Sequence, residues 1–390
     1  MTQMGKKAFS SNLLVFFFFI FLPSLLLCSC CDPACKEINR RDINGAETNG
    51  LFVFGSSLVD NGNNNFLKNS TSRADYLPYG IDFPLGPTGR FSNGKNVIDE
   101  LGELLKLPSF IPSFKNPTSK GHNILHGVNF ASGGSGILDD TGSISGCVIT
   151  LRKQIRNYQK VTLRQLAHQL GRGSKNSLIS SGILSKYLFV IGTGGNDYLL
   201  NYFLRNSTSS ASLEAFTANL IRVLSMKLKK LYSLGARKFV LISIYPIGCI
   251  PVVKTKFRIR QGCILPLNQA ASLFNSELKS LVDVIKPDMP GSNLVYVNSY
   301  KIIDDIIEDP NPRGFKDTSN ACCEVSVRKE GGSGVLCKRG GNTCGDRNSH
   351  VFFDGLHPTE AVNKLIAKIA YASSFTVETY PINVKELAKL

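Results

Sequence analysis

The stretch "LFVFGSSLVDNGNNN", residues 51–65, joins a short apolar run to a glycine, two serines and a loop rich in Asn and Gly. A continuous apolar run that ends at a glycine is typical of a strand buried on both faces. Four more runs of this kind follow: "GVNFA" (127–131), "YLFVIG" (187–192), "KFVLISI" (238–244) and "LVYVN" (294–298). Together the runs predict a central, mostly parallel sheet of five strands.

Helical patterns lie between and after these runs, at residues 213–234, 268–285 and 358–372. Strands that alternate with helices predict an α/β fold whose parallel sheet is covered on both faces. No linker or repeat divides the chain after its first 30 residues, so we expect one domain over residues 31–390. Residues 312–349 are rich in Gly, Cys and charge, and we expect a surface loop there, stapled by disulfides.

The N-terminus has the pattern of a secretory signal peptide, residues 1–30. Lys6 and Lys7 precede an apolar run at residues 13–27, which Pro23 interrupts and small residues follow. This run is short for a membrane span and fits a cleaved signal, with a buried helix or an uncleaved anchor as the alternative. No second long apolar run exists, so we expect a secreted protein without a stable membrane span.

The formal charge is +16, and its 45 Lys and Arg residues are spread over the whole chain. Such a balance favours a general attraction to polyanionic surroundings. No DNA- or RNA-binding motif accompanies it, so we expect no nucleic-acid partner.

The cysteines predict disulfides. Eleven are present, and eight remain after the three near the cleavage site are set aside: Cys35, Cys147, Cys249, Cys263, Cys322, Cys323, Cys337 and Cys344. An even set in an exported protein indicates disulfides. The alternative is a zinc cluster made by the "CC" pair with Cys337 and Cys344, although adjacent cysteines lack the usual ligand spacing of a zinc site. Cys249 with Cys263 would close one short loop. Cys322 or Cys323 with Cys337 or Cys344 would close another, and the sequence leaves the pairing open.

Two potential glycan acceptors fit export, since Asn69 and Asn206 each begin an "NST" triplet. The Asn-x-Ser/Thr pattern marks a surface loop of a secreted protein.

The stretch "FFDGLHPTEAVN" places Asp354 three residues before His357, and Pro358 suits the first position of the helix that follows. A carboxylate one turn earlier can accept from one imidazole nitrogen and leave the other facing a reacting group, as in a nucleophilic triad. The alternative is that His357 caps the helix and Asp354 is an ordinary loop residue.

A serine on a tight strand-to-helix turn would supply the nucleophile. Ser57 follows the first run, although the G-x-S-x-G elbow is absent because Leu58 and Val59 come next. The alternative is a turn serine that caps a helix.

Two further loops offer hydrogen-bond donors for an oxyanion. "GTGGNDY" places Asn196 at a strand end, and "FASGGSG" offers the amides of Gly133 and Gly134. Neither loop has the G-x-G-x-x-G spacing of a dinucleotide site, while anion binding at the second stays open.

The stretches "FVFGSSLVDNGNNN", "GVNFASGGSGI", "GTGGNDY" and "FFDGLHPTEAVN", in this order, resemble the four sequence blocks of the plant GDSL esterase/lipases, within the SGNH hydrolases. The resemblance runs from about residue 51 to about residue 373. It implies a three-layer α/β/α, flavodoxin-like fold and secreted ester hydrolysis with no cofactor and no metal.

Carried onto matching positions, the resemblance makes Ser57 the nucleophile, His357 the base and Asp354 its orienting acid. It also implies an oxyanion hole made of the Ser57 amide, the Gly133 amide and the Asn196 side chain.

The chain departs from the family's Gly-Asp-Ser-Leu pattern at Ser56, where the family has Asp. A carboxylate there could accept backbone N–H bonds and hold the turn, whereas a hydroxyl carries no charge. We expect an assembled but less rigid site and a slower esterase, so that Ser56→Asp raises kcat on a short-chain aryl ester. Phe353, where the family often has Trp, is a mild change in packing.

We therefore expect a monomeric secreted serine esterase. Its substrate would be an ester of a lipid, an acylated phenolic or an acetylated cell-wall polymer, and the residues do not choose among them. Two alternatives remain: an ester- or glycan-binding protein that lost turnover because of Ser56, and an acyltransferase that uses the same acyl-enzyme.

Overall fold

A computed structural model describes residues 46–203, 212–327 and 332–390. Residues 45–390 form one compact unit. The predicted signal peptide, the domain boundary at residue 31 and Asn206 lie outside the described residues.

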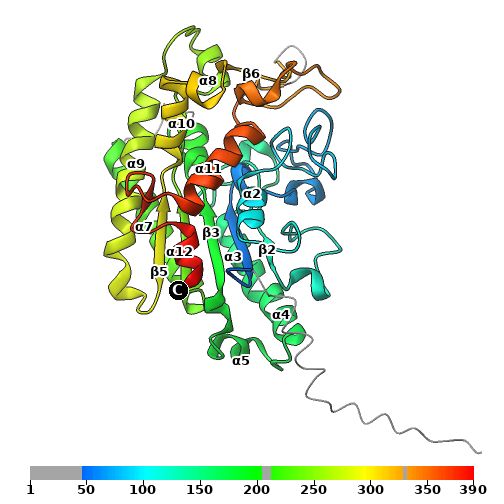
Figure 1. Ribbon diagram of the computed structural model, residues 1–390, viewed down its shortest axis with the longest axis vertical. Coiled ribbons are helices and arrows are strands. Elements are labelled where there is room, and N and C mark those ends of the chain that lie inside the picture. Colours follow the sequence, from blue (N-terminus) through cyan, green and yellow to red (C-terminus); the bar gives the residue numbers. More distant parts are fainter. Residues whose placement is uncertain (1–45, 204–211, 328–331) are drawn as a thin grey trace, which may run out of the picture. The chain divides into compact units, whose positions relative to one another are not determined.

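The five predicted strands are present and form a parallel sheet (Figure 1). Their bounds are β1 Gly50–Gly55, β2 Gly127–Asn129, β3 Tyr187–Gly192, β4 Lys238–Ile242 and β5 Asn293–Val297. A sixth strand, β8 Thr379–Tyr380, pairs antiparallel with β5, so the order is β2-β1-β3-β4-β5-β8. All residues of β1 and β3 are buried, as the continuous apolar runs predict.

Two groups of helices complete three layers (Figure 1). On one face α2, α10, α11 and α12 pack together, and α3, α7 and α9 pack together on the other. The helices are α2 Val97–Leu104, α3 Leu151–Asn157, α4 Leu163–Gln169, α5 Lys175–Ser180, α7 Leu213–Ser233, α8 Pro251–Lys256, α9 Leu265–Val284, α10 Ser299–Glu308, α11 Glu360–Ala372 and α12 Val384–Lys389.

The last long helix begins later than predicted. Thr359 occupies the N-cap of α11, and Pro358 precedes it outside the helix. The reason lies in a turn, because the Phe353 N–H donates to the His357 carbonyl and Phe352 bridges to Pro358. Neither Pro358 as the first helical residue nor His357 as the cap is therefore correct.

Aromatic rings fill the core beside β1. Phe52 and Phe54 lie two positions apart and so share one face of the strand. Tyr158 contacts both rings, at centroid distances of 5.0 Å and 5.9 Å. This ring packing fixes the carboxyl end of β1, where the turn that carries Ser57 begins.

The sheet order places a topological switch point beside β1. The chain passes from β1 to β2 on one side and returns to β3 on the other side. In open α/β sheets ligands bind at the carboxyl ends of the strands next to such a point. The loops after β1 and β3 carry Ser57 and Asn196.

The described residues contain three disulfides, Cys249–Cys263, Cys322–Cys344 and Cys323–Cys337, which give the pairings that the sequence left open. The last two staple the segment between β6 (Asp317–Ala321) and β7 (His350–Phe352), which pair in parallel. Cys147 is exposed and unbonded among the described residues, and Cys35 lies outside them.

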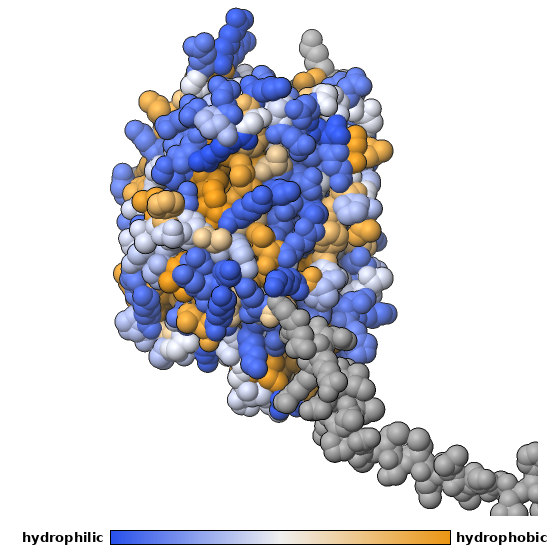
Figure 2. Space-filling view, viewed as in Figure 1, coloured by the Kyte–Doolittle hydropathy of each residue, from blue (hydrophilic) through white to orange (hydrophobic). Residues whose placement is uncertain are grey.

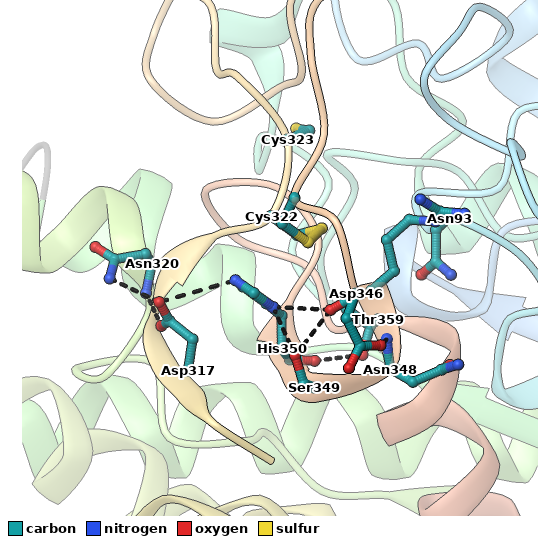
Figure 3. The surroundings of a disulfide bond; sticks show 12 residues. Asn93, Asp317, Asn320, Cys322, Cys323, Asp346, Asn348, Ser349, His350 and Thr359 are labelled. Carbon is teal, nitrogen blue, oxygen red and sulfur yellow. Dashed lines mark hydrogen bonds and ion pairs between the residues drawn. A yellow bond between two sulfur atoms is a disulfide. The ribbon is translucent and has the colours of Figure 1, made fainter. Parts of the chain in front are cut away.

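The surroundings of Cys322 bear on the zinc alternative (Figure 3). Cys322, Cys344 and His350 lie close enough to share an ion. The two sulfurs are bonded to each other, however, and the Nδ1 of His350 lies 3.1 Å from the Asp346 carbonyl oxygen. This cluster is a disulfide site with a neighbouring histidine.

Hydrophilic residues cover much of the face seen in Figure 2, with hydrophobic ones in smaller areas between them. Within the described residues no helix is long and apolar enough to cross a membrane.

Candidate active site

The turn after β1 presents Ser57. Gly55 has φ +141°, and a Cβ there would lie 2.1 Å from the Gly192 carbonyl oxygen, so only glycine fits. The Gly55 N–H donates to Gln154 Oε1 at 2.8 Å, and Gln154 Nε2 donates back to the Gly55 carbonyl at 2.9 Å. Ser57 then begins a short 3₁₀ turn, Ser57–Val59, and its side chain caps no helix.

Ser57, His357 and Asp354 lie together. The Oγ of Ser57 is 2.7 Å from His357 Nε2, and His357 Nδ1 is 2.8 Å from Asp354 Oδ2. All three are buried, Asp354 completely. Because the carboxylate can only accept, Nδ1 carries the proton, and Nε2 can accept from the serine hydroxyl.

Asp354 is held in place by four donors. Its Oδ1 accepts the N–H groups of Leu356 and His357 at 2.8 Å and 2.7 Å, and His357 Nδ1 adds its own bond. The fourth donor is the Tyr79 hydroxyl, 2.6 Å from Oδ2. Burial and the Asp354 charge keep the pKa of Tyr79 well above its ordinary value, so its hydroxyl stays protonated and donates.

Tyr79 is a site residue that the sequence analysis missed. Its hydroxyl also accepts the Cys337 N–H at 3.1 Å, and Cys337 is bonded to Cys323. The stapled segment is therefore more than a surface loop, because it supports the residue that contacts Asp354. Nothing in the sequence marks Tyr79, which lies 275 residues from Asp354.

The Gly133 amide is not free to serve an oxyanion, which corrects the expectation for this residue. Its N–H donates to Asp60 Oδ2 at 2.9 Å. The next glycine, Gly134, has φ +83° and lines the same groove as Ser57, Asn196 and His357. Among the described residues, neither the Gly134 N–H nor the Ser57 N–H has a hydrogen-bond acceptor.

Asn196 lies at the end of β3, where a π-helical segment, η7 (Asp197–Tyr202), begins. Its Nδ2 donates to the Ser135 carbonyl at 2.9 Å, which orients the amide and leaves its second hydrogen for a ligand. Asp197 next to it accepts the N–H groups of Ile137 and Leu138, joining the loops after β2 and β3.

Asp60 has the structural role that we assigned to the missing carboxylate at position 56. Besides Gly133, it accepts the N–H groups of Gly62 and Asn63 at 2.8 Å and 2.9 Å. Burial raises its pKa to about 6. The Ser56 side chain contributes little to the turn, because its hydroxyl makes one long contact, 3.4 Å, with the Gly192 carbonyl, to which the Ser56 N–H already donates at 2.9 Å. The effect of Ser56→Asp on kcat stays a prediction.

Two cavities meet at the serine. One is a recess of about 40 Å³ and the other a groove of about 800 Å³. Ser57, Asn196 and Leu356 line both. Chemically, this arrangement can supply a nucleophile, a base, an acid and hydrogen-bond donors next to two cavities.

Comparison with known proteins agrees with this geometry. Residues 51–370 match the family model described as GDSL-like Lipase/Acylhydrolase. The chain belongs to this family. By its family it is a carboxylic ester hydrolase.

Relatives in Arabidopsis thaliana cover nearly all of the described chain. GDSL esterase/lipase 7 is 41% identical over 345 residues, which are 87% of this chain and 92% of the relative. GDSL esterase/lipase At1g29670 is 40% identical over 343 residues, 87% and 91% of the two chains. A crystal structure of a GDSL-like lipase of Parabacteroides merdae covers 83% of this chain and 94% of its own, at 12% identity and a TM-score of 0.37, too distant to add to the argument.

Asn69 is exposed and adopts a positive φ of 60°, in keeping with a glycan acceptor on a surface loop. The neighbouring Ser70 and Thr71 line the groove. A glycan at Asn69 would stand at the edge of the groove.

Proposed function

We propose that this chain is a secreted serine esterase that works through an acyl-enzyme on Ser57. The observation that carries the proposal is the continuous hydrogen-bonded series from Ser57 Oγ through His357 to Asp354, at 2.7 Å and 2.8 Å. Such a series activates an otherwise weak nucleophile.

In the first half of the reaction Ser57 Oγ attacks the ester carbonyl while His357 Nε2 takes its proton. The C–O bond to the alcohol then breaks, and His357 returns the proton to the departing oxygen. In the second half His357 takes a proton from water, the hydroxide attacks the acyl-enzyme, and Ser57 regains its proton. The products are a carboxylic acid and an alcohol.

The developing oxyanion would be held by the Ser57 N–H, the Gly134 N–H and the second hydrogen of Asn196 Nδ2. Gly134 replaces Gly133 in this role because Asp60 occupies the Gly133 amide. Three fixed donors would stabilise the developing charge without having to reorganise.

Tyr79 is a positioning residue. It touches neither substrate nor nucleophile but donates to Asp354 Oδ2, the oxygen that also faces His357 Nδ1. The bond fixes the rotation of the carboxylate and hence the direction of Nε2.

Export is supported by the disulfides of the described residues, because such bonds persist in oxidising compartments. The N-terminal pattern of residues 1–30 adds to this support.

Hydrolysis of 4-nitrophenyl acetate by the purified chain tests the proposal. Ser57→Ala should lower kcat by more than 10³-fold, on the scale of losing a triad nucleophile. Ser56→Ala is the matched control and should retain most activity. Equal loss in both variants, or no turnover by the parent chain, would contradict the proposal and favour a binding protein.

A further inference from the structure

The two cavities at Ser57 are unequal in size and in chemistry. The recess is lined by Ser56, Thr193, Leu199, Ile244, Tyr245 and Ile247, among others. The groove is about twenty times larger by volume. An ester bound at Ser57 has an acyl part and an alcohol part, and each must lie in one of these cavities.

The position of His357 decides which part lies where. His357 must return a proton to the departing alcohol oxygen, so this oxygen has to face Nε2. His357 lines the groove and does not line the recess. The alcohol part therefore lies in the groove, and the acyl part lies in the recess.

The recess matches a short acyl group in size. A water-sized sphere takes about 10–15 Å³ of such a volume, so a recess of about 40 Å³ holds roughly three non-hydrogen atoms. Its wall also carries the Thr193 hydroxyl, which is buried and has no hydrogen-bond partner among the described residues. A long alkyl chain would have to extend beyond the recess and would not satisfy that hydroxyl.

Apolar and aromatic side chains, hydroxyl groups and cations line the groove. The apolar and aromatic ones are Tyr76, Phe91, Ile144, Leu200, Val335, Leu336 and Leu356. None of its lining residues in the described part of the chain is acidic. The hydroxyls come from Ser70, Thr71, Ser72, Ser145, Ser326 and Ser333, and the cations from Arg73, Lys338 and Arg339. The cations and hydroxyls suit an alcohol part with hydroxyls and negative charge, and the aromatic and apolar side chains suit the apolar faces of sugar rings.

Arg339 is the cation best placed to bind an anion. Arg73 and Lys338 are each paired with a carboxylate, Asp75 and Glu324. Arg339 stacks over the Tyr76 ring at 3.9 Å, and no ion pair to it is found within the described residues. Its guanidinium is thus exposed beside an aromatic ring at the groove, a combination that suits a carboxylate on a sugar ring.

We propose that the natural substrate is an acidic polysaccharide that bears short acyl esters, acetyl above all. This inference rests on the proposed function and specifies its substrate. The carboxylated sugar chain lies along the groove at Arg339, and the acetyl group enters the recess. Water consumes the ester, releasing acetate and leaving a free hydroxyl on the polymer.

Chain length tests the recess. We expect kcat/KM for 4-nitrophenyl acetate to exceed that for the octanoate at least ten-fold. Leu199→Ala should enlarge the recess and reduce this ratio at least five-fold. Leu200→Ala, a neighbour on the same segment that lines only the groove, is the matched control and should leave the ratio within two-fold.

Polymer charge tests the groove. Acetate release from O-acetylated polygalacturonate should exceed that from neutral O-acetylated glucomannan at least five-fold at low salt, and the difference should shrink at 0.5 M NaCl. Arg339→Gln should lower the ratio of kcat/KM on the acidic polymer to that on 4-nitrophenyl acetate about five-fold. Arg156→Gln, an exposed site on α3 outside the groove, should leave this ratio unchanged.

The outcomes separate the two proposals. A preference for octanoate, or equal rates on the acidic and neutral polymers, overturns the substrate assignment while the serine esterase stands. Failure to hydrolyse 4-nitrophenyl acetate overturns the proposed function and this inference with it.

Discussion

A substitution that removes only the Tyr79 hydroxyl tests whether this residue positions the Asp354 carboxylate. Replacing it with Phe removes one hydrogen bond to the Asp354 carboxylate and leaves the ring in place. Hydrogen bonds to charged groups contribute about 1.5–3 kcal/mol, so we expect Tyr79→Phe to lower kcat at least ten-fold. KM for 4-nitrophenyl acetate should change less than two-fold, as initial rates over a range of substrate concentrations will show.

Tyr187→Phe is the control for a purely structural loss. Tyr187 is equally buried, and its hydroxyl donates to the Leu125 carbonyl away from the triad. It should cost about 1 kcal/mol of unfolding free energy with kcat unchanged. If Tyr79→Phe, like Tyr187→Phe, lowers the unfolding free energy and leaves kcat unchanged, Tyr79 does not position Asp354.

Removal of the Asn196 side chain tests whether its amide stabilises the oxyanion. Asn196→Ala removes a donor that only the transition state uses in full, and comparable donors elsewhere are worth about 10²–10³ in kcat. We expect a loss of this size with a small change in KM, measured by steady-state kinetics. A decrease below three-fold would remove Asn196 from the proposed oxyanion hole.

For single residues, the sequence was informative about those in its motifs and uninformative about distant contacts of residues outside them. The structure brings Ser57, Asp354 and His357 together as the motifs predict. The resemblance implied the Gly133 amide for the oxyanion hole, and the structure shows that this amide already donates to Asp60. Only the position of Asp60, 73 residues from Gly133, shows which amide is occupied.

Among the elements, α3 controls the end of β1 through Gln154. This buried side chain bonds both backbone groups of Gly55, and its replacement by Met leaves a buried N–H without an acceptor. A buried unsatisfied group costs about 1–3 kcal/mol. We expect Gln154→Met to lower the unfolding free energy by about 2 kcal/mol in urea, and to lower kcat because Ser57 lies two residues from Gly55.

Gln169→Met, at the end of α4, is the matched control and should change stability by less than about 0.5 kcal/mol. Equal effects of the two substitutions would mean that Gln154 does not fix the serine turn.

Strands could be predicted from the apolar pattern of the sequence where they are completely buried. The strands from β1 to β5 were predicted for this reason, since a parallel sheet covered on both faces needs continuous apolar runs. β8 was missed because two residues carry no pattern. The later start of α11 reflects the turn that holds His357, which helix-start rules do not include.

For the whole molecule, buried carboxylates predict greater stability at mildly acidic pH. Burial raises the pKa values of Asp60 and Asp197 from 3.8 to about 6, so the folded chain binds more protons than the unfolded chain between these values. The unfolding free energy should therefore rise between pH 7 and pH 5, by about 1 kcal/mol for each residue.

The opposite sign holds at lower pH. The Asp82 pKa lies below 3.8 because its side chain bonds Arg347, and this pair contributes stability that is lost as the carboxylate is protonated. Urea unfolding should thus give greater stability at pH 5 than at either pH 7 or pH 3. Asp197→Asn should remove about half of the rise from pH 7 to pH 5, whereas Asp288→Asn, an exposed site, should not change it. A steady fall from pH 7 downward would contradict this account.

The disulfide-bonded segment between β6 and β7 could be predicted from the sequence only in part. Its composition predicted a disulfide-bonded surface loop, and its disulfides are present. Its place beside the site was not predictable, because the contact of Cys337 with Tyr79 spans 258 residues. The segment lines the groove. Its contact with Tyr79 also supports the residue that donates to Asp354.

The most direct test of the central claim is covalent labelling with a fluorophosphonate, followed by mass spectrometry of the intact chain and its peptides. We predict one adduct, on Ser57, that is absent in Ser57→Ala, retained in Ser56→Ala and strongly slowed in His357→Gln. An adduct on Ser56, or labelling that persists in Ser57→Ala at the parent rate, would contradict the assignment of Ser57 as the nucleophile.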